Sequence, residues 1–175
     1  MKYQKTLSAI FLVLLFSFSC EKNPTQSVEY GEGDDYEIYQ VVLMDCFSET
    51  EYLVILNDST VLSSIDSFQT ASFRERFPEI KDETITDFIT QNEERNRLKP
   101  IQDIDFYVFE SDYKDNGQET TSAYLSSVGY DVDKTQAIVE MGVICAPLAG
   151  HGRLIFLTKI DGEWKISGGL TIWVS

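Results

Sequence analysis

The feature that most constrains the fold is a two-residue Asp161-Gly162 turn set between two long runs of β-forming residues. Asp-Gly suits a type I′ turn, because both central residues of that turn need a positive φ. The turn also fixes the register of a hairpin over residues 153–174. The expected cross-strand pairs are Ile160 with Glu163, Lys159 with Trp164, Leu157 with Ile166, and Ile155 with Gly168.

Side chains alternate between the two faces of a strand, so this register also predicts which residues are buried. The opposite face, which includes Leu154 and Phe156, is more polar and is expected to be only partly covered. Gly168-Gly169 predicts a bulge or bend, beyond which Ile172 and Trp173 can change face. The face expected to be buried carries Trp164, Ile166, Gly168, Leu170, Ile172 and Val174, with Ile155 and Leu157.

Hydrophobic periodicity predicts the remaining elements. A first helix is expected from about Asp34 to Ser48, with Asp34 or Asp35 as its N-cap. A second helix is expected from a capping box formed by Thr84 and Asp87. The run 61–78 gives only a weak signal, and residues 146–152 are too rich in glycine for a regular element. Strands are expected at 52–56, 104–109, 125–130 and 135–145.

Helices in the first half followed by a strand meander predict an α+β fold. We expect an antiparallel sheet with the N-terminal helices packed on one of its faces. The outline is similar to the cystatin or NTF2-like shape, an analogy that concerns architecture alone. The chain shows no repeat and no long internal linker, so residues 34–175 are expected to form a single domain.

The N-terminus carries the strongest functional signal. Residues 1–19 have two lysines, a short apolar core and small residues at the exit, which is the pattern of a secretory signal peptide. The segment Ser17-Phe18-Ser19-Cys20 resembles a bacterial lipobox. The resemblance implies cleavage before Cys20 and acylation of that residue. Two or three acyl chains anchor a protein where one does not, because each buried methylene contributes about 0.8 kcal/mol.

The residues after Cys20 set the expected location. Glu21 in place of Asp implies, by resemblance to Gram-negative sorting rules, the outer membrane; the periplasmic and the surface side both stay open. Residues 20–33 lack apolar periodicity and are predicted to be the lipidated N-terminus and a flexible tether.

The mature chain is strongly acidic. The full chain has a formal charge of −15, which becomes −17 once Lys2 and Lys5 leave with the signal peptide. Such a surface repels nucleic acid, so nucleic acid is not an expected partner. The expected partners are the membrane, through the lipid, and either an envelope protein or a small ligand. No cofactor is indicated by any motif.

Several motifs of the second half resemble an uncharacterised family of small bacterial lipoproteins. They are the segment Ser127–Ala137 (SVGYDVDKTQA), Gly142, the Gly-His-Gly around His151, the Asp-Gly-x-Trp-Lys at 161–165 and the terminal Trp173-Val174-Ser175. The first half is similar in outline around residues 45–49. The resemblance implies the same fold and anchoring, and it adds no catalytic residue.

Cys145 and His151 are the one pair with catalytic potential. A thiol nucleophile needs a nearby base to take its proton, and His151 is the single histidine of the chain. The alternative is structural, since no third orienting residue can be selected from the sequence and glycines flank His151. A disulfide between Cys46 and Cys145 is a further possibility in an oxidising compartment, and two buried thiols are its alternative.

Two acidic groups and two aromatic residues complete the candidates. Glu32, Asp34 and Asp35 form one acidic group and Asp131 with Asp133 another, but neither has the spacing of a calcium loop, so no metal site is predicted. Tyr130 and Trp173 are candidates for a ligand-facing side of the sheet, whereas Trp164 is expected in the core.

Three functional hypotheses follow from the sequence. The preferred one is a lipid-anchored envelope protein with a non-enzymatic binding or interaction role. The second is an envelope thiol hydrolase that uses Cys145 and His151, and the third is a small-ligand carrier with an NTF2-like pocket.

Overall fold

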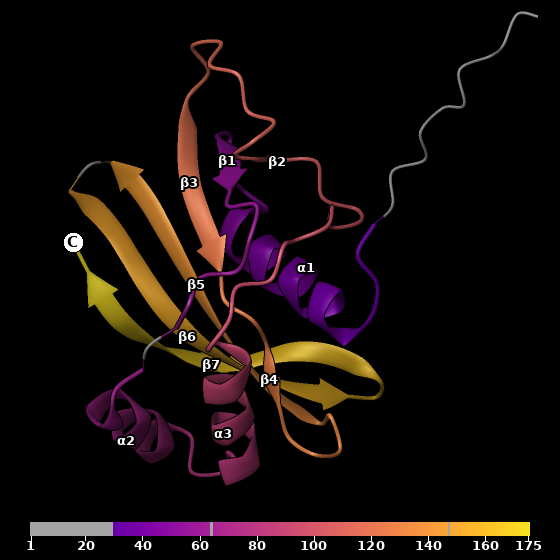
Figure 1. Cartoon of the computed structure of the whole chain (residues 1–175), viewed down its shortest axis with the longest axis vertical. Coiled ribbons are helices and arrows are strands. Elements are labelled where there is room, and N and C mark those ends of the chain that lie inside the picture. The colour runs from indigo at the N-terminus through magenta and orange to yellow at the C-terminus, as the bar shows by residue number, and fades with distance from the viewer. Residues whose placement is uncertain (1–29, 64, 147) are drawn as a thin grey trace, which may run out of the picture.

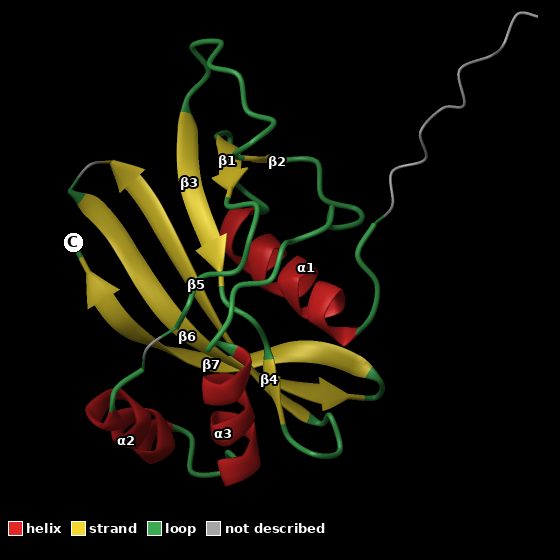
Figure 2. Cartoon of the chain, viewed as in Figure 1, coloured by secondary structure: helices red, strands yellow, loops and turns green. Residues whose placement is uncertain are grey.

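The computed structural model describes residues 30–63, 65–146 and 148–175. These residues form three helices and one seven-stranded, mostly antiparallel sheet, which confirms the predicted α+β class and C-terminal meander (Figure 1). Figure 2 separates the helices from the strands by colour, and in chain order the three helices precede all strands but β1. The helices are α1 (Asp34–Phe47), α2 (Ser67–Arg76) and α3 (Asp82–Gln91). The strands are β1 (Leu53–Leu56), β2 (Tyr107–Phe109), β3 (Thr120–Leu125), β4 (Gly129–Tyr130), β5 (Gln136–Ala146), β6 (Ala149–Ile160) and β7 (Glu163–Val174).

The sheet is antiparallel in its C-terminal part and parallel around β1. Its strand order is β2-β1-β3-β5-β6-β7, and β4 pairs with β5 beside this path. β1 runs parallel to both β2 and β3, whereas the pairs from β3 onward are antiparallel. The prediction of an antiparallel sheet is therefore wrong for β1. Long connections separate β1 from both neighbours, and only such connections permit parallel pairing.

The C-terminal hairpin turns at Asp161 and Gly162, whose φ values of 54° and 87° suit the predicted turn. The three predicted pairs nearest the turn, Ile160–Glu163, Lys159–Trp164 and Leu157–Ile166, are present. The ladder then shifts, so that Ile155 lies opposite Gly169 and the predicted pair with Gly168 is wrong. A second shift follows near Gly152. Each shift is a β-bulge with an extra residue in β7, at Ser167 and Ile172.

Helices cover both faces of the sheet, so the prediction of helices on a single face is wrong. α1 packs against one face through a cluster that contains Ile38, Val42 and Leu43. α2 and α3 pack against the other face through Phe73 and Phe88. Figure 1 shows α2 and α3 together near the lower end of the sheet, apart from α1.

The apolar cluster beneath α2 and α3 contradicts two further predictions about the hairpin. Leu154 and Phe156, expected on a partly wet face, are fully buried beneath α2 and α3. Leu170 and Ile172 pack on this cluster, whereas Trp164 and Ile166 pack on the cluster of α1. The extra residue at Ser167 reverses the alternation, so β7 does not present one apolar face throughout. The bulge predicted at Gly168-Gly169 is thus present one residue earlier, and Ile172 changes face as that prediction allowed.

The helix starts also differ from the predictions. The N-cap of α1 is Gly33 without a side-chain cap, because the Asp34 carboxylate accepts hydrogen bonds from Lys159 and Trp164 instead. α3 starts at Asp82, and Thr84, the predicted cap, is buried inside it. α2 lies in the region with a weak signal and begins with a capping box of Asp66 and Gln69.

The predicted loop at 146–152 is wrong over most of its length. β6 already begins at Ala149, and Gly150 and Gly152 pair with residues of β5. A Cβ atom at Gly152 would lie 1.9 Å from the Trp173 ring nitrogen. The absence of a side chain at Gly152 lets the Trp173 ring lie against β6. A glycine at this position is therefore compatible with a regular strand. The predicted strand at 125–130 is likewise divided, between the end of β3 and the two residues of β4.

The predicted signal peptide (1–19), the acylated Cys20 and most of the tether lie outside the described residues. The end of the predicted tether is described and lies on the domain, because the Gly31 N–H donates to the Pro100 carbonyl at 2.9 Å. Within the described segments, no helix has the length and apolar character that crossing a membrane requires.

Candidate functional site

The sequence candidates Cys145 and His151 line one open pocket, beyond the C-terminal end of α1. We name it the thiol pocket; its volume is about 590 Å³. It also contains Cys46, so the three residues considered for thiol chemistry share a single site. The lining residues are Cys46, Phe47, Thr50, Tyr52, Glu119, Thr120, Thr121, Val143, Cys145 and His151.

The β5–β6 pairing positions Cys145 and His151. His151 lies opposite Val143, and the ladder passes over Cys145 before it resumes at Ala146 and Ala149. Cys145 therefore lies at a bulge, where its side chain is exposed, whereas His151 is half-buried.

Cys46 reaches the same pocket from the last turn of α1 and is half-buried. Burial raises the pKa of the Cys46 thiol, against the opposing effect of the nearby Arg153 guanidinium. Cys46 is therefore a neutral thiol at neutral pH. Both cysteines are free, so the disulfide between Cys46 and Cys145 stays a prediction. The mass of the oxidised protein after alkylation tests it, because a disulfide leaves neither thiol to alkylate.

Cys145 and His151 line the same pocket, but no hydrogen bond between them is present in the described part of the chain. None of the hydrogen bonds formed by the described side chains involves Cys145 Sγ or the His151 ring. A thiol nucleophile needs a base close enough to accept its proton through a hydrogen bond. In unliganded enzymes the distance between thiol and base is commonly longer than in the complex with substrate. Among the described residues, no group of three or more His, Cys, Asp and Glu side chains has the arrangement of a metal site.

A second open pocket adjoins the thiol pocket across the α1–β1 connection. We name it the acidic shelf; its volume is about 660 Å³. It shares Cys46, Thr50 and Tyr52 with the thiol pocket and adds Asp45, Ser48, Glu49 and Glu51. The parallel pairing of β1 with β3 brings Glu119 beside this connection, since the Leu53 N–H donates to the Glu119 carbonyl at 3.2 Å. The two pockets are therefore neighbours that share Cys46, Thr50 and Tyr52.

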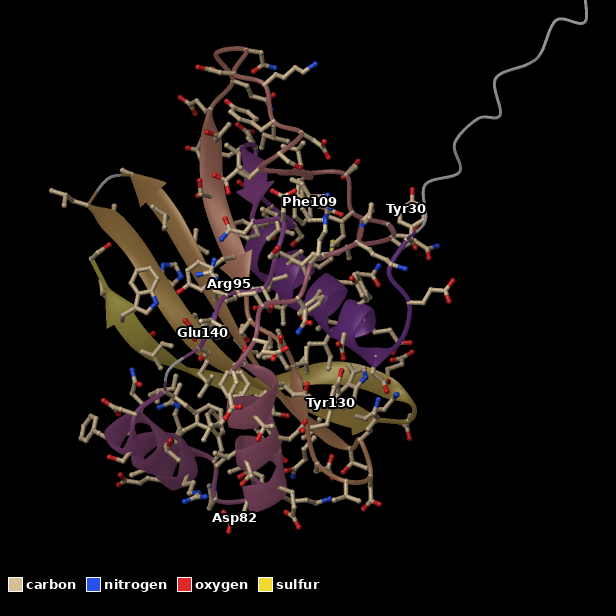
Figure 3. The ribbon with its side chains drawn as sticks, in the orientation of Figure 1. Tyr30, Asp82, Arg95, Phe109, Tyr130 and Glu140 are labelled. Carbon is tan, nitrogen blue, oxygen red and sulfur yellow. The ribbon has the colours of Figure 1, made fainter. Side chains whose placement is uncertain are left out.

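Tyr130 and Trp173 lie on opposite faces of the sheet and line no common surface. The Tyr130 hydroxyl donates to Asp35 at 2.6 Å, and its ring packs on Trp164 in the cluster of α1. The Trp173 ring stacks on Tyr124 and donates to the Tyr124 hydroxyl at 2.8 Å. That hydroxyl donates to the buried Glu140, which Figure 3 labels well apart from Tyr130. Trp164 is buried, as predicted.

Asp34, Asp35 and Asp131, from the two acidic groups named above, are held by partners within the protein. Asp34 accepts from Lys159 and Lys134, and Asp35 accepts from Tyr130. Asp131 is buried and accepts from Lys81 and from the backbone and hydroxyl of Thr135. These carboxylates fasten loops and helix ends to the sheet.

Tyr52, Glu49 and Glu119 were not predicted as site residues from the sequence. A signal for the shelf was present, because the last turn of α1 contains no basic residue while acidic residues surround it. Such a helix end disfavours neighbouring carboxylates. No local signal marks Glu119, whose place depends on the parallel pairing of β1 with β3.

Comparison of the chain with protein-family models, with curated proteins and with solved structures found no match.

Proposed function

We propose that this protein is anchored by lipid to the bacterial outer membrane and that its α+β domain binds a ligand in the thiol pocket without catalysing a reaction. The anchoring is supported by the leader at 1–19, by Cys20, and by the resemblance to small bacterial lipoproteins. The binding role depends on a single observation, the open pocket at the end of α1.

The thiol pocket has the properties of a small-molecule site. Binding pockets commonly have volumes of roughly 300–1,000 Å³ and combine an apolar lining with a few polar groups. Phe47 and Val143 supply apolar surface, while Thr121 and His151 supply polar atoms. The pocket lies where the cover provided by α1 ends, so a ligand can reach it from solvent.

The anchoring is tested by mass spectrometry of the native protein and by a Cys20→Ser variant. We expect the native protein to start at an acylated Cys20 and to fractionate with membranes. We expect the variant to be released from membranes, because the thiol that receives the lipid is missing. A bare Cys20, or a leader still attached, contradicts the anchoring proposal.

The binding role is tested by screening a set of small fragments against the full mature chain by NMR. We expect fragment-dependent shift changes to cluster at Thr120, Thr121, Val143 and His151. If the changes gather elsewhere, or if no fragment produces them, the thiol pocket is not a binding site.

A thiol hydrolase is the second candidate, because Cys145 and His151 line the same pocket. This candidate requires Cys145 to react with a thiol probe at neutral pH much faster than a free model thiol does. A rate equal to that of the model thiol, together with unchanged fragment binding in a Cys145→Ala variant, removes it.

A further inference from the structure

The class of ligand can be inferred for the thiol pocket, on the assumption that the binding role proposed above holds. We propose that the pocket takes a small organic cation, in which an amine or guanidinium group is attached to an apolar or aromatic body. The body would lie in the thiol pocket, and the charged group would lie toward the acidic shelf.

The floor of the thiol pocket suits an apolar body. Phe47 and Val143 line this floor and are 5% and 3% exposed, so packing holds them in place and each offers a small, fixed apolar area. Tyr52 is shared by both pockets and is 49% exposed, which leaves its ring available to a ligand. An aromatic face also attracts a cation placed over it.

The charged side chains that line the two pockets are all acidic. Neither pocket is lined by a lysine or an arginine, and the charged lining residues are Asp45, Glu49, Glu51 and Glu119. Within the described chain, none of these four carboxylates takes part in a side-chain hydrogen bond or ion pair. Asp34 and Asp131 contrast with them, because each is held by a lysine. The four pocket carboxylates are therefore the ones available to an external cation.

The end of α1 adds to the same field. The C-terminus of a helix carries partial negative charge from its last carbonyl groups, and α1 has no basic residue in its last turn to offset it. Burial raises the pKa of Cys46, and Arg153, the cation that opposes this effect, lies on the sheet and lines neither pocket. These acidic groups would repel the carboxylate of an anionic ligand and attract the amine of a cationic one.

The experiment titrates the full mature chain, in a non-ionic detergent, with three ligands that share one ring and differ in charge. They are 2-phenylethylamine, 2-phenylethanol and phenylacetate, followed by NMR shifts at Thr120, Thr121 and Val143. We expect the amine to bind at least tenfold more tightly than phenylacetate, with the alcohol between them. Added salt should reduce this preference, because it screens exposed charges.

Two variants test the role of the pocket carboxylates. A Glu49→Gln, Glu119→Gln double variant removes two charges with little change of shape, and neither side chain has a partner in the described chain to lose. We expect its affinity for the amine to fall about five- to tenfold, from the modest contribution of each exposed charge. The matched control is Glu163→Gln at the distant hairpin turn, which should bind as the parent does.

The outcomes separate the two proposals. If the alcohol or phenylacetate binds at these residues as tightly as the amine, or if the double variant binds as the parent does, the cation preference is wrong while the pocket remains a binding site. If none of the three ligands shifts the pocket resonances, both the cation preference and the binding role are contradicted.

Discussion

Asp34 joins the start of α1 to the C-terminal hairpin. Its carboxylate accepts from Lys159 Nζ at 2.6 Å, from Trp164 Nε1 at 3.1 Å and from Lys134 Nζ at 3.3 Å. The hydrogen bond from Lys159 is the main reason that the pKa of Asp34 falls to about 2. One side chain thus connects the first helix to two segments that follow it by a hundred residues or more.

Replacement of Asp34 by asparagine tests this connection. The amide keeps the shape but removes the charge that the two lysines contact, and we expect the free energy of unfolding to fall by about 1–2 kcal/mol. Urea denaturation measures the change. Asp133→Asn is the matched control, because Asp133 is exposed and its contact with Lys81 is long, at 4.0 Å. This change should alter the free energy of unfolding by less than about 0.5 kcal/mol. Equal effects of the two changes would contradict the role of Asp34.

At the scale of elements, Gly129 sets how closely α3 approaches β4. A Cβ atom at this position would lie 2.2 Å from the backbone N and Cα atoms of Phe88. A flexible side chain could move out of the way, but the backbone of a packed helix cannot. The hydrogen bond from the Tyr130 N–H to the Asp87 carboxylate, at 2.8 Å, depends on the same close approach.

We expect Gly129→Ala to destabilise the protein by about 3 kcal/mol, because the added methyl group must displace α3 from the sheet. Gly117→Ala is the control: Gly117 has φ 77° and open space around it, so its cost is the backbone conformation alone, about 1 kcal/mol. Chemical denaturation of both variants gives the comparison. A cost at Gly129 no larger than that at Gly117 would show that α3 can move freely.

Local signals in the sequence were sufficient for some elements and insufficient for others. The Asp161-Gly162 turn predicted the pairs nearest to it, and Gly168-Gly169 predicted a bulge one residue from its actual place at Ser167. The second bulge, at Ile172, had no local signal. The capping box of Asp66 and Gln69 was present in a region with a weak signal, so α2 could have been predicted from it. The parallel pairs of β1 have no local signal at all.

The same distinction holds for the candidate site. Cys145 and His151 were found from their spacing, since the two strands that carry them are consecutive and pair with each other. Cys46 was placed on the correct helix by its periodicity. Tyr52 and Glu119 line the same pocket only because β1 lies beside β3, and no local pattern predicts this long-range pairing.

At the scale of the whole molecule, one sheet lies between two helical layers, and a carboxylate of low pKa fastens each layer. Asp34 fastens α1. Asp131 fastens the start of α3 through Lys81; its burial raises its pKa, but hydrogen bonds from Lys81, Gln136 and Thr135 outweigh that effect and lower it to about 2. Both layers therefore depend on groups that remain charged in mild acid.

The pH dependence of stability follows from these two carboxylates. Each has a lower pKa in the folded protein than in the unfolded chain, so its contribution is complete above about pH 4 and is lost as the pH falls toward 2. We expect the urea midpoint to fall steeply over this interval. Asp34→Asn and Asp131→Asn should each be less stable at pH 7 and should show a shallower fall. An unchanged slope in both variants would assign the acid sensitivity to other groups.

The bulges at Ser167 and Ile172 have a consequence for the rim of the sheet. β7 is the last strand in the sheet order, so no strand of the described residues lies along its outer side, and the opposite edge of the sheet ends in β2, which has only three residues. A foreign chain that docked along β7 would need a straight, uninterrupted row of amide donors and acceptors. The two extra residues interrupt that row. They therefore make the outer edge of β7 a poor template for intermolecular β-aggregation.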